Sequence, residues 1–600
     1  MSFNETRTKV LLRTVPGYRE QLVRLAARYS SGGQRGEASA EVDLEEFLAS
    51  LQLVNTWPDL PGVWFAPDLR ALAETSVRDA QAVDERLSAG ERGGTVFEAV
   101  DPGDVPGRLG TDWVAPLTSF QVRDIAKLLS LTHGANFSVP GAGKTRTALA
   151  VYAALRAEGS VRQLLVVGPK SAYEAWQEES TTCFSSAPHM QVFAKHADYS
   201  AEIILINYER LNRVQAELAE WVSDKPTMIV LDEAHRMKLG VQGAYGAACM
   251  ALGPLASHRL ILTGTPAPNG AKDLESLLSF VWPGHGRRVV DRAVGGKDLA
   301  YASQVLRPLF TRTTKNELGL PPVKIRRQSI LLPAAHRRLY SALVNKVIPE
   351  GDTEQERFAK LGRVMVYLMM ASTSPALLEE GSSKHEPLPF YVPPLEIPQD
   401  DSLSALMRDL PRYELSPKYK EVIRVVTENA EAGRKTLVWS TFVRNLTSLE
   451  RALQKFKPAV VHGGTIDRER QIKRFRSEQD CMVLLSNPAT LGEGISLHHV
   501  CHDAIYVDRD FAAGRFLQSL DRIHRLGLAS DTETRITVLT AEGTIDDVVH
   551  ERLGRKLTFL GAILDDPALQ QLADPEEDMD GWGMDVSDRQ AVLAHVDAAS

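Results

Sequence analysis

Residues 518–527 read QSLDRIHRLG, and this stretch constrains the architecture of the whole chain. Its two arginines, Arg522 and Arg525, are three positions apart and would share one face of a helix. Far upstream, residues 141–145 read GAGKT and residues 232–235 read DEAH. A glycine-rich loop can hold phosphates, paired carboxylates can hold their metal, and arginines can neutralise the terminal phosphate. The sequence therefore predicts a site completed by two separate halves of the chain.

Length and composition limit the kind of protein. A chain of 600 residues is too long for a single core, so three or four structural units are expected. The hydrophobic content of 44% and the charged content of 24% are typical of a soluble protein. No apolar run approaches the roughly 18 residues that span a bilayer, and the N-terminus lacks the layout of a secretory signal. We therefore expect no membrane partner.

Cysteine usage and charge narrow the class further. The four cysteines are scattered without a C-x-x-C pair, which argues against disulfide and zinc frameworks and fits a reducing cytoplasm. The net charge of −8 weakly disfavours a general polyanion binder. A local basic groove remains compatible with it, because binding responds to the local potential.

Short apolar runs alternate with helical stretches in two series. Runs fully apolar over four or so residues indicate strands covered on both faces, hence parallel sheets with crossover helices. The first series comprises residues 164–167, 203–206, 228–231 and 260–262, and the second comprises 436–440, 460–461, 482–486, 504–507 and 535–539. Prolines are dense between residues 387 and 398, which prevents regular pairing. The fold class is thus α/β, with two parallel-sheet lobes.

The expected organisation has five parts. We expect an N-terminal accessory domain (1–108), a first lobe (109–325), a helical insertion with a proline-rich linker (326–415), a second lobe (416–560) and an acidic tail (561–600). In the first part, a helix is predicted over 17–29, and Trp57, Trp64 and Phe65 are expected to pack a small core. A DNA-contacting module is the alternative for this part. Residues 565–588 hold nine acidic and no basic residues, which indicates a solvated, mobile tail or, alternatively, a DNA-mimicking brake.

The glycine-rich loop carries the nucleotide chemistry. Gly141, Ala142 and Gly143 would turn the backbone so that its N–H groups point at phosphates. Lys144 would reach the β- and γ-phosphates, and the Thr145 hydroxyl suits Mg²⁺. The loop departs from the usual pattern, because residue 138 is serine rather than glycine and Pro140 removes one N–H.

The acidic pair follows a predicted strand directly, at the edge of the sheet where ligands bind in open α/β folds. Asp232 would hold the metal, and Glu233 would orient and deprotonate the attacking water. His235 fits coupling between nucleotide and polymer sites better than metal binding, because no second histidine or cysteine lies at ligand spacing. The side-chain amide of Gln121 could match the edge of adenine.

At this point the chain resembles the Swi/Snf-type ATPases of helicase superfamily two, over about residues 115–555. Further motifs in the family's order carry the resemblance: 165–171 with Trp176, 207–209, 232–238, 262–266, 306–309 with 320–322, 437–440, 462–465 and 492–497. The resemblance implies tandem RecA-like lobes and specific roles. It implies DNA contacts by Lys170, Ser171, Asn207, Ser440 and Thr465, coupling by Thr263, Thr265 and Gln518, and nucleotide binding by Gly494.

Three departures from the family pattern stand out. Residues 138–140 (SVP) replace an acidic, methionine-bearing segment, Glu493 lies inside a loop that is usually glycine-rich, and Leu528 replaces a common glutamine. None removes a catalytic group. The departures leave the subfamily open. The linker is shorter than the insertions of large eukaryotic remodellers and no bromodomain-like or chromodomain-like segment is visible, which favours a prokaryotic or phage-defence member, in the cytoplasm, over a nucleosome remodeller.

The function that the resemblance implies is an ATP-driven, Mg²⁺-dependent translocase on double-stranded DNA. Backbone contacts would make its movement sequence-independent and salt-sensitive. A strand-separating or fork-remodelling helicase is one alternative, with residues 1–108 as its wedge. A non-hydrolysing DNA-binding scaffold is another. Any DNA cleavage is expected to come from a separately encoded nuclease or defence-system subunit.

Overall fold

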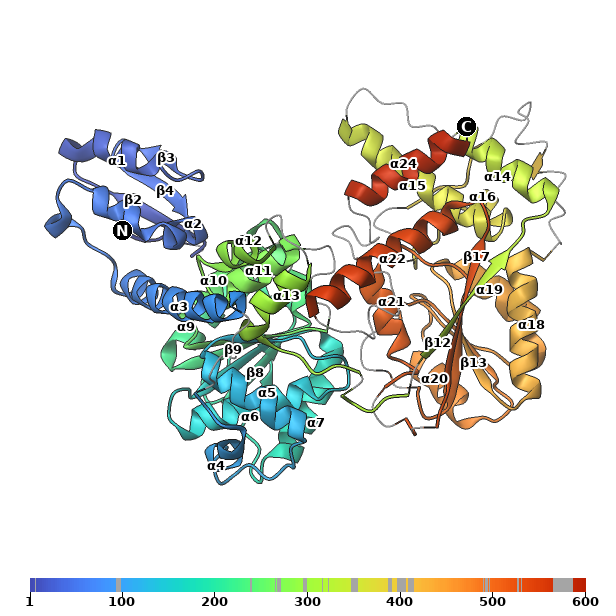
Figure 1. Cartoon of the computed structure of the whole chain (residues 1–600), viewed down its shortest axis with the longest axis horizontal. Coiled ribbons are helices and arrows are strands. Elements are labelled where there is room, and N and C mark those ends of the chain that lie inside the picture. Colours follow the sequence, from blue (N-terminus) through green and yellow to red (C-terminus); the bar gives the residue numbers. More distant parts are fainter. Residues whose placement is uncertain are drawn as a thin grey trace. The chain divides into compact units, whose positions relative to one another are not determined.

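The computed structural model describes residues 1–5, 7–92, 99–237, 240–264, 266, 271–294, 299–315, 317–321, 323–346, 354–386, 391–396, 406–407, 415–488, 490–491, 495, 497–525, 528–529, 531–564 and 586–599 (Figure 1). The chain divides into two compact units. The first comprises Met1–Glu317, and the second begins at Leu318. No helix within the described ranges is both long and apolar enough to cross a membrane.

The first unit begins with a small antiparallel sheet, in the order β1-β2-β4-β3. Its strands are β1 (Ser2–Phe3), β2 (Lys9–Arg13), β3 (Gly33–Gly36) and β4 (Ser39–Asp43). Alternation in β2 buries Val10 and Leu12 on one face, against α1 (Arg19–Ala26) and α2 (Leu44–Ala49). The predicted helix over 17–29 is confirmed as a 3-10 turn (Pro16–Tyr18) followed by α1.

The expected aromatic core of this region is only partly correct. Trp57 and Phe65 pack against the buried cluster, whereas Trp64 is 65% exposed. The sheet itself was not predicted, because its strands are too short and polar to give a periodic signal. The long helix α3 (Pro67–Glu91) then runs to the first lobe, where Ser76 donates to the carbonyl of Pro283.

The first lobe is built on a parallel sheet, which has seven strands among the described residues. The order is β11-β5-β10-β9-β6-β8-β7. The strands are β5 (Gly134–Asn136), β6 (Gln163–Val167), β7 (Met190–Val192), β8 (Ile203–Ile206), β9 (Thr227–Asp232), β10 (His258–Leu262) and β11 (Phe310–Thr311). All four strands of the first predicted series are confirmed, as β6, β8, β9 and β10.

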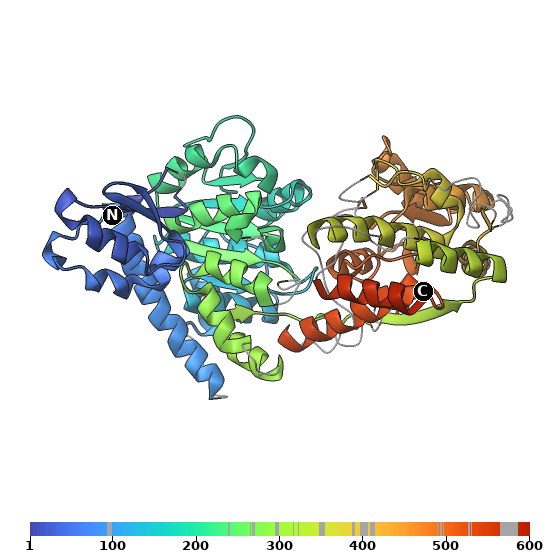
Figure 2. The same cartoon turned by 90° about the horizontal axis from the view of Figure 1, so that it is seen from above.

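Helices cover both faces of this sheet (Figures 1 and 2). They are α4 (Val105–Arg108), α5 (Ser119–Leu131), α6 (Lys144–Ala157), α7 (Tyr173–Cys183), α8 (Tyr208–Leu211), α9 (Gln215–Asp224), α10 (Ala244–Leu252), α11 (Ala271–Val281), α12 (Gly286–Val294) and α13 (Leu299–Leu306). This double cover explains why every residue of β6, β8 and β9 is buried.

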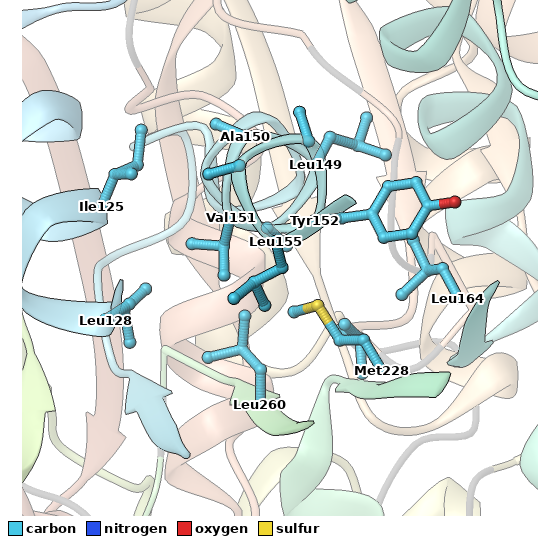
Figure 3. Close-up of a cluster of buried hydrophobic side chains, with 14 of the residues drawn as sticks. Ile125, Leu128, Leu149, Ala150, Val151, Tyr152, Leu155, Leu164, Met228 and Leu260 are labelled. Carbon is cyan, nitrogen blue, oxygen red and sulfur yellow. The ribbon is translucent and has the colours of Figure 1, made fainter. Parts of the chain in front are cut away.

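Helix α6 anchors the phosphate loop to the core. Its side chains Val151 and Leu155 face Met228 and Leu260 of the sheet (Figure 3). Burying side chains of this size stabilises the fold by about 1.5–3 kcal/mol each. The first turn of α6 is therefore held rigidly at the sheet edge.

The second unit also has a parallel sheet, which has six strands among the described residues, in the order β12-β17-β16-β13-β15-β14. The strands are β12 (Val323–Ile330), β13 (Lys435–Trp439), β14 (Ala459–Val461), β15 (Val483–Ser486), β16 (Cys501–Tyr506) and β17 (Thr534–Ala541). The associated helices are α18 (Pro417–Glu431), α19 (Val443–Ala452), α20 (Arg468–Ser477), α21 (Ala513–Leu520) and α22 (Ile545–Leu564). All five strands of the second predicted series are confirmed, so the chain has two parallel-sheet α/β lobes.

The expected lobe boundary at residue 325 needs correction, because it falls inside β12. This strand pairs with β17 over its full length, from Val323 with Thr534 to Ile330 with Ala541. It is an edge strand, and residues 324–327 are exposed. Its charged sequence therefore resembles a linker although it completes the second sheet.

The expected insertion and tail also need correction. Helices α14 (Ala334–Lys346), α15 (Glu354–Thr373) and α16 (Ala376–Glu380) share a hydrophobic core with α22. The C-terminal helix α24 (Val586–Ala599) joins this core through Val592. Residues 586–599 are thus a packed helix rather than a solvated tail, and most of the acidic run, residues 565–585, lies outside the described residues.

Candidate active site

The phosphate loop connects β5 to the start of α6. Gly141 and Gly143 have φ angles of +89° and +76°, which a residue with a Cβ rarely adopts. A Cβ on Gly143 would also lie 2.4 Å from Nε2 of Gln121. The amide of Ala142 donates to the carbonyl of Val139 at 3.2 Å and closes the turn. Both glycines are therefore required by the loop's own geometry.

The lysine and threonine of the loop lie at the first turn of the helix. Lys144 is the first residue of α6, and its Nζ donates to the carbonyl of Ser138 at 3.0 Å. Thr145 is the next residue and is partly exposed. The helix N-terminus and the ammonium group together provide positive potential for an anion.

Gln121 supports the loop from α5. Its Nε2 donates to the carbonyl of Ala142 at 3.4 Å, and its Oε1 accepts from the amide of Thr118 at 3.0 Å. The Thr118 side chain in turn caps the helix, which completes a capping box. The expected contact with adenine stays a prediction.

The unusual residues of the loop have specific partners. The hydroxyl of Ser138 donates to Asp124 of α5 at 3.3 Å and accepts from the amide of Thr313 at 2.9 Å. Pro140 packs against Gly264, where a Cβ would lie 3.0 Å from the proline ring. The departures from the usual pattern are therefore compensated within the lobe.

Asp232 ends β9, two strands from the phosphate-loop strand. Its Oδ1 accepts from the amide of Glu233 at 2.9 Å, and its Oδ2 accepts from Nε1 of Trp176 at 2.9 Å. Burial raises the pKa of Asp232 to about 6, and the negative charge of Glu233 acts in the same direction. The hydrogen bond from the Trp176 indole and the positive charge of Lys144 lower this pKa and so partly oppose the shift.

Glu233 has a backbone φ of +49°, a left-handed conformation that is uncommon for a non-glycine residue. Its carboxylate lies 3.5 Å from Nδ1 of His235. The same nitrogen lies 3.2 Å from the hydroxyl of Thr263, at the end of β10. The amide of Thr263 donates to the carbonyl of Asn136, the last residue of β5. A continuous polar route therefore joins the acidic pair to the phosphate-loop strand.

The donor set fits Mg²⁺. A carboxylate from Asp232 and a hydroxyl from Thr145 are hard oxygen ligands, and each Asp232 oxygen already bonded to an N–H group keeps a lone pair. Phosphate oxygens and water would complete the octahedron.

The structure adds positioning residues that the motifs did not reveal. Arg312 is 2% exposed, and its Nη1 donates to the carbonyls of Phe137 and, at 3.4 Å, Gly264. Tyr208 is fully buried, and its hydroxyl donates to the carbonyl of Asp232 at 2.9 Å. Tyr208 lies inside the motif at 207–209, which gave it no role of its own, whereas no motif includes Arg312.

The residues expected to contact DNA differ in accessibility. Lys170 is exposed, whereas Asn207 is 4% exposed and donates from Nδ2 to Glu209. Ser440 is fully buried, and its hydroxyl donates to Asp508 at 2.5 Å, so that side chain is not available to DNA in this conformation. Thr465 is partly exposed and its hydroxyl accepts from the amide of His462. For Ser171, only the backbone is described.

The predicted arginine pair needs correction. Helix α21 ends at Leu520, so Arg522 and Arg525 follow it in a turn rather than sharing its face. Arg522 is 8% exposed, and its Nη1 donates to the carbonyl of Ile495 at 3.3 Å, whereas Arg525 is partly exposed. Gln518 lies in α21 and is partly exposed. Gly494 and Thr265 lie outside the described residues.

Comparisons with known proteins cover both lobes. Residues 137–374 match the SNF2-related domain, and residues 417–527 match the helicase conserved C-terminal domain. The chain is 26% identical over 470 residues to "SWI/SNF-related matrix-associated actin-dependent regulator of chromatin subfamily A containing DEAD/H box 1" of Mus musculus, covering 68% of this chain and 45% of the relative. It is 25% identical over 458 residues to "Chromodomain-helicase-DNA-binding protein 1-like" of Danio rerio, covering 71% and 41%.

Among solved structures, the chain is similar to the "Sulfolobus solfataricus SWI2/SNF2 ATPase core in complex with dsDNA", with 20% identity, coverage of 80% of this chain and 97% of that one, and a TM-score of 0.34. The chain spans less than half the length of the two curated relatives above. The two domain matches follow one another in the order of the two lobes described above. The chain belongs to the Swi/Snf-type ATPases of helicase superfamily two.

Proposed function

We propose that this chain hydrolyses ATP with Mg²⁺ and uses the energy to translocate along double-stranded DNA without separating the strands. The observation that supports it most is the polar route from Glu233 through His235 and Thr263 to the phosphate-loop strand. Through these contacts, a change in the bound nucleotide can shift the loops that follow neighbouring strands at the same edge of the sheet.

The proposed chemistry assigns one task to each residue. Lys144 and the loop amides would hold the phosphates, and Asp232 and Thr145 would hold Mg²⁺, which would supply positive charge beside those phosphates. Glu233 accepts a proton from the attacking water, and His235 holds the Glu233 side chain at 3.5 Å. Arg525 and Arg522 supply positive charge to the γ-phosphate as it leaves.

The proposed DNA contacts are contacts to the phosphate backbone. In this proposal, Lys170, Asn207 and Thr465 contact the phosphate backbone, which carries no sequence information. The rate of ATP hydrolysis should then rise with duplex length and fall steeply with salt, whatever the sequence.

Two assays side by side test this function. A translocase displaces the third strand of a DNA triplex but leaves a forked duplex paired, whereas a fork-remodelling helicase separates the fork. The Glu233→Gln variant is the matched control, because it keeps the shape of the side chain and loses the base. It should bind ATP normally and hydrolyse it about 10²–10⁴-fold more slowly. DNA-independent ATP turnover in the parent chain, or no turnover at all, would refute the proposal.

The setting of this activity is a further part of the proposal. We infer a role in phage defence or DNA repair beside a separately encoded nuclease, supported by the short linker between the two lobes and by the lack of a visible bromodomain-like or chromodomain-like sequence. Capture with the slowly hydrolysing variant, bound to ATP and duplex DNA, would recover such a nuclease. Recovery of chromatin proteins instead would contradict it.

A further inference from the structure

Two segments of the first lobe that we propose to contact DNA each lead to the same residue, Asp232. After Lys170, helix α7 begins at Tyr173, and Trp176 lies one turn into it. After Asn207, helix α8 begins at Tyr208. Trp176 donates from Nε1 to Oδ2 of Asp232, and Tyr208 donates from its hydroxyl to the carbonyl of the same residue, both at 2.9 Å.

Both aromatic residues are rigidly packed. Trp176 is 1% exposed and Tyr208 is 0% exposed, so neither ring can move without its helix. Asp232 is 8% exposed, and the backbone of Gly168 at the neighbouring strand end lies close enough that an added Cβ there would be 3.1 Å from the Cβ of Asp232. A shift at the start of either helix therefore reaches Asp232 directly.

The hydrogen bond from the Trp176 indole restricts the orientation of the Asp232 carboxylate. An indole N–H can only donate, so it requires Oδ2 to be an acceptor. The amide of Glu233 occupies Oδ1 in the same manner. Together the two N–H groups fix the plane of the carboxylate.

We propose that Trp176 and Tyr208 act as an aromatic brace, through which DNA bound near Lys170 and Asn207 sets the position of Asp232 and hence its affinity for Mg²⁺. The inference rests on the proposed function, since it assumes that these segments contact DNA. Trp176 and Tyr208 are positioning residues, because they act through Asp232 rather than on the nucleotide.

The test compares two indole deletions in the full chain. Trp176→Phe keeps a buried ring and removes the N–H group. Trp221→Phe does the same at a control site, since Trp221 is fully buried in α9 of the same lobe and donates to the carbonyl of Asp198 at 3.2 Å. Binding of Mn²⁺ to each variant with ADP is followed by electron paramagnetic resonance, with and without duplex DNA.

The brace predicts that Trp176→Phe binds Mn²⁺ about tenfold more weakly, the effect of losing one hydrogen bond to a charged group. Duplex DNA should strengthen Mn²⁺ binding in the parent chain and in Trp221→Phe, but not in Trp176→Phe. Tyr208→Phe should show the same loss of the DNA effect, and it serves as the second variant if Trp176→Phe does not fold.

Equal Mn²⁺ affinities and equal DNA effects in Trp176→Phe and Trp221→Phe would overturn the inference. This outcome is distinct from failure of the proposed function. A parent chain that does not hydrolyse ATP would refute the function, while the Mn²⁺ affinities would still show whether the indole positions Asp232.

Discussion

The hydroxyl of Ser138 lies 3.3 Å from Oδ2 of Asp124, and both side chains are almost completely buried. Thr313 closes the cluster, with its hydroxyl 2.9 Å from the same carboxylate oxygen. The cluster joins the phosphate loop to α5 and to the segment after β11. Ser138 stands where the usual phosphate-loop pattern has a glycine. Its side chain is held by hydrogen bonds, which a glycine could not make.

We expect Ser138→Ala to lower the free energy of unfolding by about 1–3 kcal/mol, because a buried carboxylate loses a donor. Denaturant unfolding of the parent and variant measures the change. Ser200→Ala is the matched control, since Ser200 also donates to an aspartate, at 2.7 Å, but on the exposed surface. Equal stability of the two variants would show that Asp124 does not depend on the loop hydroxyl.

The free energy of unfolding of the first unit should decrease at acidic pH, over a defined pH range. Burial lowers the pKa of His133 to about 4, with the Arg259 guanidinium acting in the same direction. A histidine in the unfolded chain has a pKa near 6.5, so between pH 4 and pH 6.5 the unfolded chain binds more protons than the folded chain. The free energy of unfolding should therefore fall as the pH is lowered from 6.5 to 4, and change little for this reason above 6.5.

Unfolding in urea at several pH values tests this dependence. His258 acts in the same direction, because burial lowers its pKa to about 4 as well. Asp79, whose carboxylate lies 3.4 Å from His133, opposes the effect by favouring the charged ring. His133→Asn should reduce the slope below pH 6.5, and an unchanged slope would exclude this histidine as its source.

The nine strands predicted in the two lobes, β6, β8, β9, β10 and β13 to β17, were recognisable because they are mostly buried and apolar along their length. Residues 203–206 (IILI) match β8 without error. Strand β12 escaped prediction for the opposite reason, since residues 324–327 of this edge strand are exposed and mostly charged. Apolar runs reveal central strands, whereas edge strands are specified by the neighbour with which they pair.

The candidate site likewise contains residues that a local sequence pattern indicates and residues that no such pattern indicates. The sequence predicts Lys144, Asp232 and His235 as site residues because the proposed chemistry requires those residue types at fixed spacing. The supports around them come from distant parts of the chain, such as Arg312, which reaches the carbonyl of Phe137 across a separation of 175 residues. Contacts of this kind depend on the packed fold, and no local pattern encodes them.

The C-terminal helix should depend on one buried carboxylate. Asp588 is fully buried and pairs with Arg552 and Lys556 of α22. Asp588→Asn removes a negative charge that pairs with two buried cations, which should cost about 3–5 kcal/mol. Faster amide hydrogen exchange in α24 would reveal its detachment. Gln590→Ala, at an exposed position of the same helix, should leave exchange unchanged, and slow exchange in both variants would contradict the prediction.

The two arginines after α21 should differ in what their loss disturbs. Arg522 is nearly buried, its Nη1 donates to Ile495, and its carbonyl accepts from the amide of Leu497 at 2.8 Å. Arg522→Ala should therefore lower both stability and turnover. Arg525 is partly exposed, so Arg525→Ala should reduce ATP hydrolysis by about 10³-fold or more while stability and ATP binding stay near the parent values.

Steady-state hydrolysis, ATP binding and thermal unfolding, measured on the same preparations, separate these effects. Arg535→Ala is the control for hydrolysis and ATP binding, because Arg535 lies on β17 and pairs with Glu533 and the nearly buried Asp503 rather than with residues of the candidate site. It should leave these two measurements close to the parent. If Arg525→Ala hydrolyses ATP as fast as Arg535→Ala, the charge on the γ-phosphate must come from another residue, and Arg525 would have no part in catalysis.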